Sequence, residues 1–230
     1  MLTLLGIVLV VSLLLTAFGR NGTPTPQTVA GMTPLLGSSQ PSPQVVALHG
    51  SLRLQMPIAQ SHITAIGYHA AGDGSLALTP VGRQGNEGMV ARLVHKLVGG
   101  GGGSPVWYQL EGGSGPATSA LDVGAAPGTD VYAPADGTVV GITPFVVAGR
   151  RFGARIDIQP QSAPSLIVSL TQLRADPSIS VGSSVEAGHS KLGTVVDLSD
   201  VERQALARYT QDAGNHVSIE VRPAATLTLD

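Results

Sequence analysis

The pattern of hydrophobic and polar positions changes several times along this chain. Residues 2–18 contain no charged side chain and are mostly apolar. Residues 20–44 contain five prolines and little apolar content, and from residue 45 onward short apolar stretches alternate with turn-forming residues. Uninterrupted apolar runs, proline-rich runs and short alternating runs are typical of membrane segments, extended linkers and β-strands. The pattern therefore predicts an apolar leader, a linker and a folded part built mainly of strands.

The apolar leader is long enough to reach across most of a bilayer. Its 17 residues span about 25 Å as a helix, near the short limit for crossing a membrane. Ala17-Phe18-Gly19 also offers a small-x-small cleavage site. We therefore expect residues 1–19 to be a signal peptide or a membrane anchor. Either would make the protein exported: secreted if the leader is cleaved, or anchored to the membrane through residues 2–18 if it is retained.

The proline-rich residues 20–44 cannot bury enough apolar surface to fold by themselves. Their composition favours an extended chain. We expect them to be a tether that holds the following domain away from a membrane surface.

Residues 45–110 are predicted to form strands and one helix. The stretches "VVALHGSLRLQMP" and "HITAIGY" alternate and are rich in β-branched residues, as strands are. Residues 86–98 place apolar side chains on one face of a helix, and five glycines at 99–103 end it. Because this region is small for an independent domain, we expect it to pack with the strands that follow.

Residues 111–230 are predicted to be mainly β. The stretches "DVYAP", "GTVVGI", "RIDIQP", "SLIVSL" and "HVSIEV" are each bounded by glycine or proline. One helix is predicted over 199–212, because Ser199 and Glu202 match a capping box and Gly214 follows where a C-cap glycine belongs.

Composition excludes several kinds of function. Charged residues make up 12% of the chain and the net charge is −2, so no basic surface supports nucleic-acid binding. The chain has no cysteine, which excludes disulfides, thiolate zinc sites, a cysteine nucleophile and a lipid anchor on cysteine.

Four ordered motifs in residues 118–221 resemble the LytM/lysostaphin-type zinc metallopeptidases, which cut peptide cross-bridges of peptidoglycan. The motifs are "DVGAAPGTDVYAPADGTVV", "IVSLTQL" in place of Y-x-H-L, "ISVGSSVEAGHSKLGTV", and "HVSIEV" in place of H-x-H-x-E. The resemblance implies a mainly β fold, a LytM-like β-barrel or sandwich of the duplicated hybrid motif type. Two or three short helices would accompany it.

The same resemblance shows that most of the family's reactive side chains are replaced. The family's H-x-G-x-D reads T-S-A-L-D, so Thr118 stands for a zinc-binding histidine and Asp122 remains. In H-x-H, His216 matches the catalytic histidine and Ser218 stands for the second zinc-binding histidine. The histidine of Y-x-H-L corresponds to Gln172. A hydroxyl is a poor zinc ligand beside imidazole or carboxylate, so hydrolysis by the family's mechanism should fail.

Three hypotheses follow from these replacements. The first is a non-catalytic LytM-like envelope protein that binds peptidoglycan or regulates a wall hydrolase, with Asp122 and His216 in its cleft and no cofactor. The second is an active zinc endopeptidase whose ligands come from elsewhere in the chain. The third is a structural module of an envelope complex.

Other side chains admit two interpretations. Asp122 alone is more often a residue that hydrogen-bonds its own turn, and a lone strand histidine such as His216 is more often structural. Substitute ligands would come from His49, His62 or His69, although no zinc-site spacing supports them. Trp107 and Tyr108 offer a stacking surface for a sugar, but packing at a sheet edge is the simpler role.

Two further families are excluded by missing residues. The glycine run at 99–103 lacks the Lys-Ser/Thr of a phosphate-binding loop. A biotinyl or lipoyl domain would need a lysine between 137 and 182, and there is none.

Overall fold

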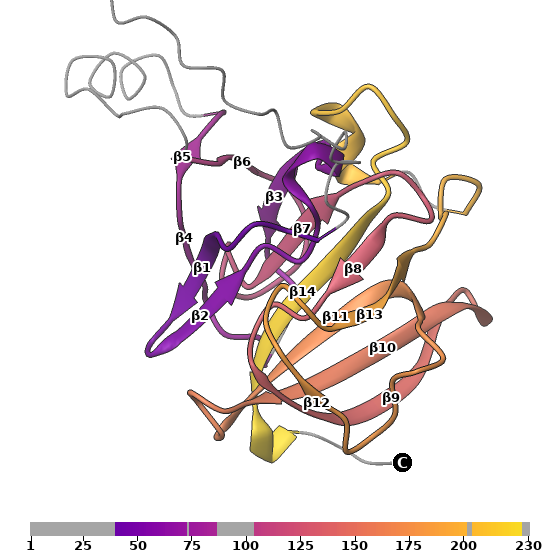
Figure 1. Ribbon diagram of the computed structural model, residues 1–230. Helices are drawn as coiled ribbons and strands as arrows, with labels where there is room; N and C mark the ends of the chain where they lie inside the picture. The colour runs from indigo at the N-terminus through magenta and orange to yellow at the C-terminus, as the bar shows by residue number, and fades with distance from the viewer. Residues whose placement is uncertain (1–39, 73, 87–103, 202–203, 227–230) are drawn as a thin grey trace, which may run out of the picture. The chain divides into compact units, whose positions relative to one another are not determined.

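Strands dominate the part of the chain that the computed structural model describes, which is residues 40–72, 74–86, 104–201 and 204–226 (Figure 1). The strands form one small sheet and one large sheet. The expected leader at 1–19, most of the expected linker at 20–44 and the glycine run at 99–103 lie outside these residues. So does the predicted helix over 86–98, except for Asn86.

The small sheet comes from the first described residues. Its strand order is β2-β1-β4, with β1 at Val45–His49, β2 at Leu52–Gln55 and β4 at Thr79–Pro80. A tight turn containing Gly50 joins β1 to β2, and the φ of +55° there suits glycine. The predicted strands in "VVALHGSLRLQMP" are confirmed.

The large sheet has the strand order β12-β9-β10-β11-β14-β7-β3-β6-β5. Its strands are β12 (Ser184–Val185), β9 (Gly137–Val147), β10 (Arg150–Pro160), β11 (Leu166–Ala175), β14 (His216–Pro223), β7 (Ala120–Gly124), β3 (Ile66–His69), β6 (Val106–Gln109) and β5 (Arg83–Gln84). A branch leaves β11 through β13 (Lys191–Val195) to β8 (Asp130–Tyr132). Pairing is parallel at β3–β6 and β5–β6 and antiparallel elsewhere.

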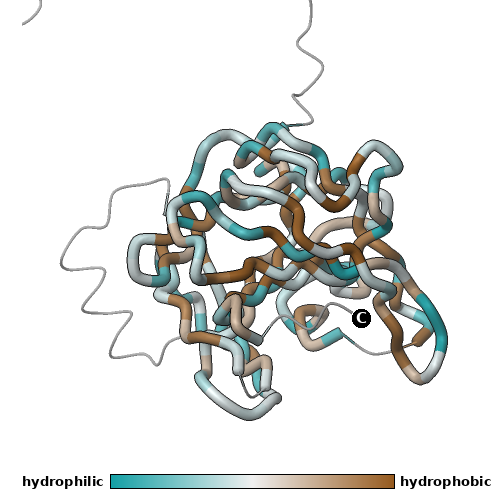
Figure 2. The backbone as a smooth tube through the Cα atoms, turned by 90° about the horizontal axis from the view of Figure 1, so that it is seen from below, coloured by the Kyte–Doolittle hydropathy of each residue, from teal (hydrophilic) through white to brown (hydrophobic). Residues whose placement is uncertain are grey.

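The sequence pattern explains which strands are covered on both faces. The first half of β9 alternates buried and half-buried positions, as a strand with one covered face does. All five residues of β7 are buried, which matches its uniformly small or apolar side chains apart from Asp122. Hydrophobic stretches accordingly run through the middle of the molecule, with polar ones in the connections (Figure 2).

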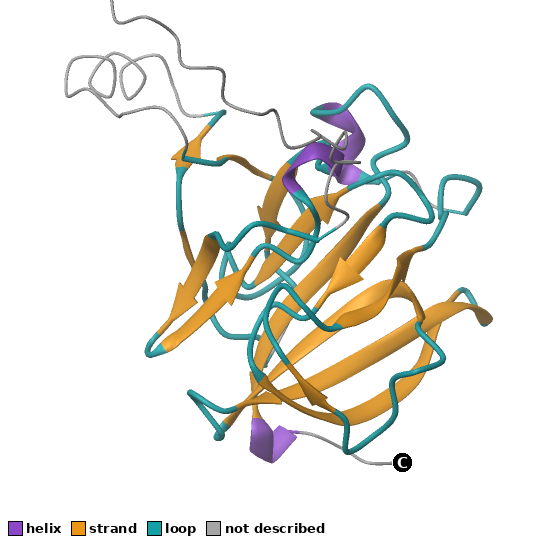
Figure 3. Cartoon of the chain, viewed as in Figure 1, coloured by secondary structure: helices purple, strands orange, loops and turns teal. Residues whose placement is uncertain are grey.

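Helix is confined to short 3₁₀ segments in the described residues (Figure 3). They are η1 (Gln60–His62), η2 (Ala205–Arg208) and η3 (Ala224–Thr226). No helix in these parts of the chain has the length and apolarity needed to cross a membrane.

The predicted helix over 199–212 is wrong. Only η2 is helical there, and residues 202–203 lie outside the described part. The Ser199 hydroxyl donates to Asp197 Oδ1 at 2.6 Å, so it forms a local turn with the preceding aspartate. Local capping signals predicted a helix that the tertiary structure replaces with a loop.

The expected barrel is also corrected, because the large sheet does not close. Its ends are the two-residue strands β12 and β5, which do not pair with each other. The branch from β11 through β13 ends at β8, so the described strands form no continuous ring of hydrogen bonds. The mainly β class is confirmed, but the architecture is an open, branched sheet.

Candidate functional site

Three neighbouring strands bring the candidate residues together. Strand β7 lies between β14 and β3, and Asp122 is the only charged residue of β7. In the pairing register, Asp122 lies opposite Ser218 on β14 and opposite Gly67 on β3. His216 begins β14, and His69 ends β3. The site therefore includes a strand from the N-terminal region.

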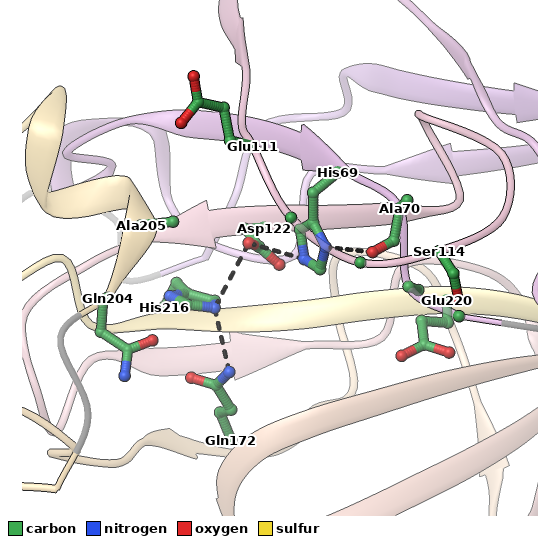
Figure 4. Close-up of a pocket in the computed structure, with 14 residues that line it drawn as sticks. His69, Ala70, Glu111, Ser114, Asp122, Gln172, Gln204, Ala205, His216 and Glu220 are labelled. Carbon is green, nitrogen blue, oxygen red and sulfur yellow. Dashed lines mark hydrogen bonds and ion pairs between the residues drawn. The ribbon is translucent and has the colours of Figure 1, made fainter.

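Two histidines converge on one carboxylate oxygen (Figure 4). His69 Nε2 lies 3.2 Å from Asp122 Oδ2, and His216 Nε2 lies 3.5 Å from the same atom. The side chains of Asp122 and His216 are 4% and 6% exposed, whereas that of His69 is 28% exposed. Asp122 is thus a buried carboxylate with a partly exposed imidazole on one side and a buried one on the other.

The hydrogen bonds of His69 identify its charge state. Its Nδ1 lies 2.9 Å from the carbonyl oxygen of Ala70, and its Nε2 faces the carboxylate of Asp122. Both neighbours are acceptors, so both ring nitrogens must donate. The hydrogen bond to Asp122 raises the pKa of His69 to about 9, with burial opposing the shift. His69 is therefore an imidazolium at neutral pH, and it neutralises Asp122.

Burial and charge act in opposite directions on Asp122. Burial, the largest single influence, raises its pKa, but the two imidazoles and the Ser218 hydroxyl outweigh burial. The pKa of Asp122 consequently lies below its ordinary value. A buried carboxylate that stays ionised needs such partners, because an unpaired buried charge is costly.

His216 is oriented by backbone and amide contacts. Its Nδ1 donates to the carbonyl oxygen of Gly214 at 2.9 Å. Its Nε2 lies 3.1 Å from Gln172 Nε2 and 3.5 Å from Asp122 Oδ2. Gln172 has a φ of +63°, a left-handed conformation that non-glycine residues adopt at a cost of about 1–3 kcal/mol. The fold tolerates this strain at the residue that contacts His216.

A pocket of about 430 Å³ opens over this cluster. Asp122, His69, His216 and Gln172 all contribute to its lining. The rest of the lining is Ala70, Ala71, Gly72, Glu111, Gly112, Gly113, Ser114, Gln204, Ala205 and Glu220. Figure 4 shows these side chains gathered from several strands and loops around Asp122. The lining therefore carries polar and charged side chains among small ones, and it comes from both residues 45–110, the N-terminal region, and residues 111–230, the LytM-like region.

The loop over residues 111–115 forms one wall of this pocket. Three of its glycines have positive φ, at +121° for Gly112, +75° for Gly113 and +91° for Gly115. A Cβ atom at Gly113 would overlap the carbonyl oxygen of Ala70. Glycine at 113 therefore allows the loop to lie against the chain that follows His69.

The two replaced zinc positions are not arranged for metal binding. The Thr118 hydroxyl donates to the carbonyl oxygen of Leu78 at 2.6 Å, and neither Thr118 nor Ser218 lines the pocket. Asp122 is already engaged by His69. In the described ranges, no three or more His, Asp or Glu side chains are placed to hold a metal ion. The zinc that the resemblance implies therefore does not fit the family's positions in this chain.

The remaining candidates lie elsewhere. His49 Nδ1 contacts the carbonyl oxygen of Ala77, and His62 is exposed in η1. Trp107 packs edge-on against Tyr68 at 5.2 Å, and Tyr108 stacks on Tyr209 at 4.2 Å. These aromatic side chains pack within the fold, and none lines the pocket.

Sequence reasoning named His69 only as one of three histidines that could replace a ligand. The spacing gave no reason to select it, because the partner of β3 in the sheet was unknown. Only the register of the folded sheet identifies His69, because there it lies opposite Ala120, two residues from Asp122 on the neighbouring strand.

Several solved structures similar to this chain are peptidases of the type that the sequence motifs resemble, and another is the SpoIIQ–SpoIIIAH pore-forming complex, which matches with a TM-score of 0.31 and 24% identity over 45% of this chain and 56% of that chain. The solution structure of lysostaphin matches with a TM-score of 0.36 and 16% identity over 49% of this chain and 39% of lysostaphin. The M23 metalloprotease pseudoalterin matches with a TM-score of 0.40 and 14% identity over 76% of this chain and 72% of pseudoalterin. The catalytic domain of the M23 protein EnpA from Enterococcus faecalis matches with a TM-score of 0.34 and 20% identity over 49% and 73%.

No protein-family model and no curated protein matches the chain. This chain spans 39% of the length of lysostaphin, and the TM-scores with lysostaphin, pseudoalterin and EnpA are all below 0.5. These similarities therefore assign no activity to the protein, and its chemistry has to be judged from its own side chains.

Proposed function

We propose that this chain is a non-catalytic LytM-like protein of the cell envelope that binds peptidoglycan, or regulates a wall hydrolase, through the pocket over Asp122. One observation carries the proposal. Asp122, which the motif resemblance marks as a zinc ligand, is paired with the imidazolium of His69, while Thr118 and Ser218 offer only hydroxyls. A protonated histidine has no lone pair for a metal.

The pocket is suited to binding a peptide. Ser114, Gln172 and Gln204 bring hydroxyl and amide groups to its wall, and Glu111 and Glu220 bring carboxylates. Such groups can form hydrogen bonds with the backbone and side chains of a peptide. Peptide cross-bridges of peptidoglycan are the part of the cell wall that enzymes of the resembled family cut.

Protein location is part of the same proposal. Residues 1–19 would direct export as a signal peptide or anchor, and 20–44 would be the linker. Residues 45–110 would pack as the N-terminal region against a LytM-like domain at 111–230. The protein would then act outside the cytoplasm, either released or held at the membrane.

Binding to purified peptidoglycan sacculi tests the wall-binding form of the proposal. The wild-type chain should sediment with sacculi. Ser114→Trp, which fills the pocket from its wall, should reduce the sedimented fraction severalfold. Ser165→Trp places the same side chain at an exposed position outside the pocket and should sediment like the wild type.

Two results would contradict wall binding through this pocket. If the wild type stays in the supernatant, the hydrolase-regulating form or a structural module in an envelope complex takes its place. If Ser114→Trp binds as well as Ser165→Trp, the wall is bound at another surface.

An active zinc endopeptidase with non-standard ligands is the second candidate. One observation favours it: His69 and His216 bring two imidazole Nε2 atoms to the same carboxylate oxygen. Zinc content after exposure to zinc and desalting separates the two candidates. Near-stoichiometric zinc that Asp122→Ala abolishes would support the peptidase, and its absence from the wild type would support the binding protein.

A further inference from the structure

The hairpin formed by β9 and β10 extends past its neighbours in the large sheet (Figure 1). Pairing of β10 with β11 reaches no further toward the tip than Ala154, and β12 pairs with β9 only at residues 137–138. Residues 145–153 therefore form ladder hydrogen bonds only within the hairpin.

A tight two-residue turn shapes the tip. Ala148 and Gly149 both have positive φ, at +48° and +77°, as a type I′ turn requires. Val147 pairs with Arg150, and Val146 pairs with Arg151. The turn thus presents two valines on one strand and two arginines on the other.

The tip carries positive charge that the described part of the protein does not neutralise. Arg150 and Arg151 are exposed, and no acidic side chain in the described residues lies within 4.0 Å of either. No Asp or Glu occurs from residue 137 to 156. The next arginine, Arg155, differs because its guanidinium binds Asp157 at 2.8 Å.

Apolar side chains accompany these arginines. Val146 is 53% exposed, and Phe145, Val147 and Phe152 are only partly buried. The Arg150 guanidinium lies 5.3 Å from the centre of the Phe152 ring, which is a cation–π distance. Arginines that lack a carboxylate partner in the described residues and lie beside exposed apolar side chains are complementary to an anionic bilayer. Its headgroups attract the positive charge, and apolar side chains can insert just beneath the headgroups.

We propose that the β9–β10 tip docks on an anionic lipid surface. Arg150 and Arg151 would contact the headgroups, and the Val146 side chain would insert among the headgroups. This inference rests on the proposed membrane attachment through residues 2–18 for proximity. Two arginines bind lipid weakly alone, but a tethered domain experiences a high effective lipid concentration.

The linker proposed at residues 20–44 would be long enough for such contact. Twenty residues, 20–39, span at most roughly 60–70 Å when extended. The 11 residues of β9 span about 36 Å. A domain on this linker can therefore turn its hairpin tip toward the surface in which the leader is held.

Because the chain has no cysteine, a single introduced cysteine can be labelled without side reactions at other thiols. Val146→Cys in the full chain introduces a single thiol for an environment-sensitive fluorophore. The labelled protein is reconstituted into vesicles of phosphatidylcholine alone or of phosphatidylcholine with phosphatidylglycerol. We expect a blue shift and a severalfold increase in emission only in the vesicles with phosphatidylglycerol, reduced by high salt because salt screens surface charge.

Two matched variants locate the effect. Arg150→Glu with Arg151→Glu in the labelled chain should abolish the increase. Val181→Cys carries the label at another exposed valine and should respond equally to both kinds of vesicle. Equal emission from the Val146 label in both vesicles, or an unchanged response after the arginine replacements, would overturn the proposal.

Flotation of the same samples separates this proposal from the anchoring on which it rests. If the chain floats with both kinds of vesicle and the Val146 label does not respond, the hairpin proposal fails and anchoring stands. If the chain floats with neither, both anchoring and hairpin docking fail, because the full chain then does not bind the anionic surface. Flotation only with phosphatidylglycerol, lost in the arginine variant, would support the hairpin without an anchor.

Discussion

His69 supplies positive charge beside Asp122, where the resembled family holds zinc. We expect His69→Ala to reduce the free energy of unfolding by about 2–3 kcal/mol at pH 7, because it leaves a buried carboxylate with less compensation. Chemical denaturation measures this. His62→Ala, which removes an exposed histidine from η1, should change stability by less than about 0.5 kcal/mol.

A second substitution distinguishes charge from packing. Asp122→Asn in the His69→Ala background removes the carboxylate charge that His69 no longer balances. The double variant should therefore recover part of the lost stability. A double variant no more stable than His69→Ala would mean that the imidazole acts through its volume.

The pH dependence of the same pair has a defined sign. The pKa of His69 is about 9 in the folded protein and about 6.5 in an unfolded chain. The pair's contribution is complete below pH 6.5 and decreases as pH rises toward 9, because the folded state then holds a proton that the unfolded state has released. Asp122 stays ionised throughout this range because its pKa is lowered.

We expect the stability difference between wild type and His69→Ala to fall by about 2 kcal/mol between pH 6.5 and 9.5, with allowance for the partial exposure of His69. Urea denaturation of both proteins at several pH values measures it. A difference that stays constant or grows with pH would show that His69 is not protonated in the folded protein.

For individual residues, the sequence motifs predicted which of the family's site positions are replaced, but not which side chains contact the positions that remain. The resemblance located Asp122, His216 and Gln172, which the structure brings to one pocket. It gave no sign that His69 would complete the cluster, because neighbouring strands in a sheet need not be neighbours in sequence. The alternative that Asp122 serves only its own turn does not agree with its contacts across β3 and β14.

Among the connecting elements, the glycine loop at 111–115 depends on one close contact. Gly113→Ala should destabilise the protein by about 2 kcal/mol or more, because it adds overlap with the Ala70 carbonyl to a strained φ. Gly112→Ala is the matched control, since its φ is also positive but its Cβ would have open space. Thermal unfolding of both variants checks this. Equal losses would mean that strain alone matters.

Strands were predicted better than helices because their signals are of different kinds. Alternation and β-branched residues in "GTVVGI" and "HVSIEV" reflect burial in the final fold, and β9 and β14 form there. The capping box at Ser199 is a purely local signal, and Asp197 competes for the same hydroxyl. Nothing local indicated that β9 and β10 would extend past β11 as a long hairpin.

For the whole described fold, the N-terminal region and the LytM-like region share one sheet. Strand β3 pairs with β7 over four positions, and β6 and β5 continue the sheet beyond it. Leu54, Ile58 and Tyr68 of the N-terminal region lie in the same core cluster as Leu121 and Ile219. The small size of residues 45–110 predicts that they do not fold by themselves, and the shared core cluster is a physical argument for that prediction.

A chain that begins at residue 111 should therefore fail to fold alone. It would expose the edge of β7, lose the apolar contacts made by residues 45–110 and leave Asp122 without His69. We expect this fragment to aggregate or to lack a cooperative transition, whereas a chain that begins at residue 40 should unfold cooperatively. The soluble yield and the calorimetric unfolding transition are measured for the chain that begins at residue 111 and for the chain that begins at residue 40. Cooperative unfolding of the shorter chain would show that the LytM-like region is an independent domain and that β3 is an addition to its sheet.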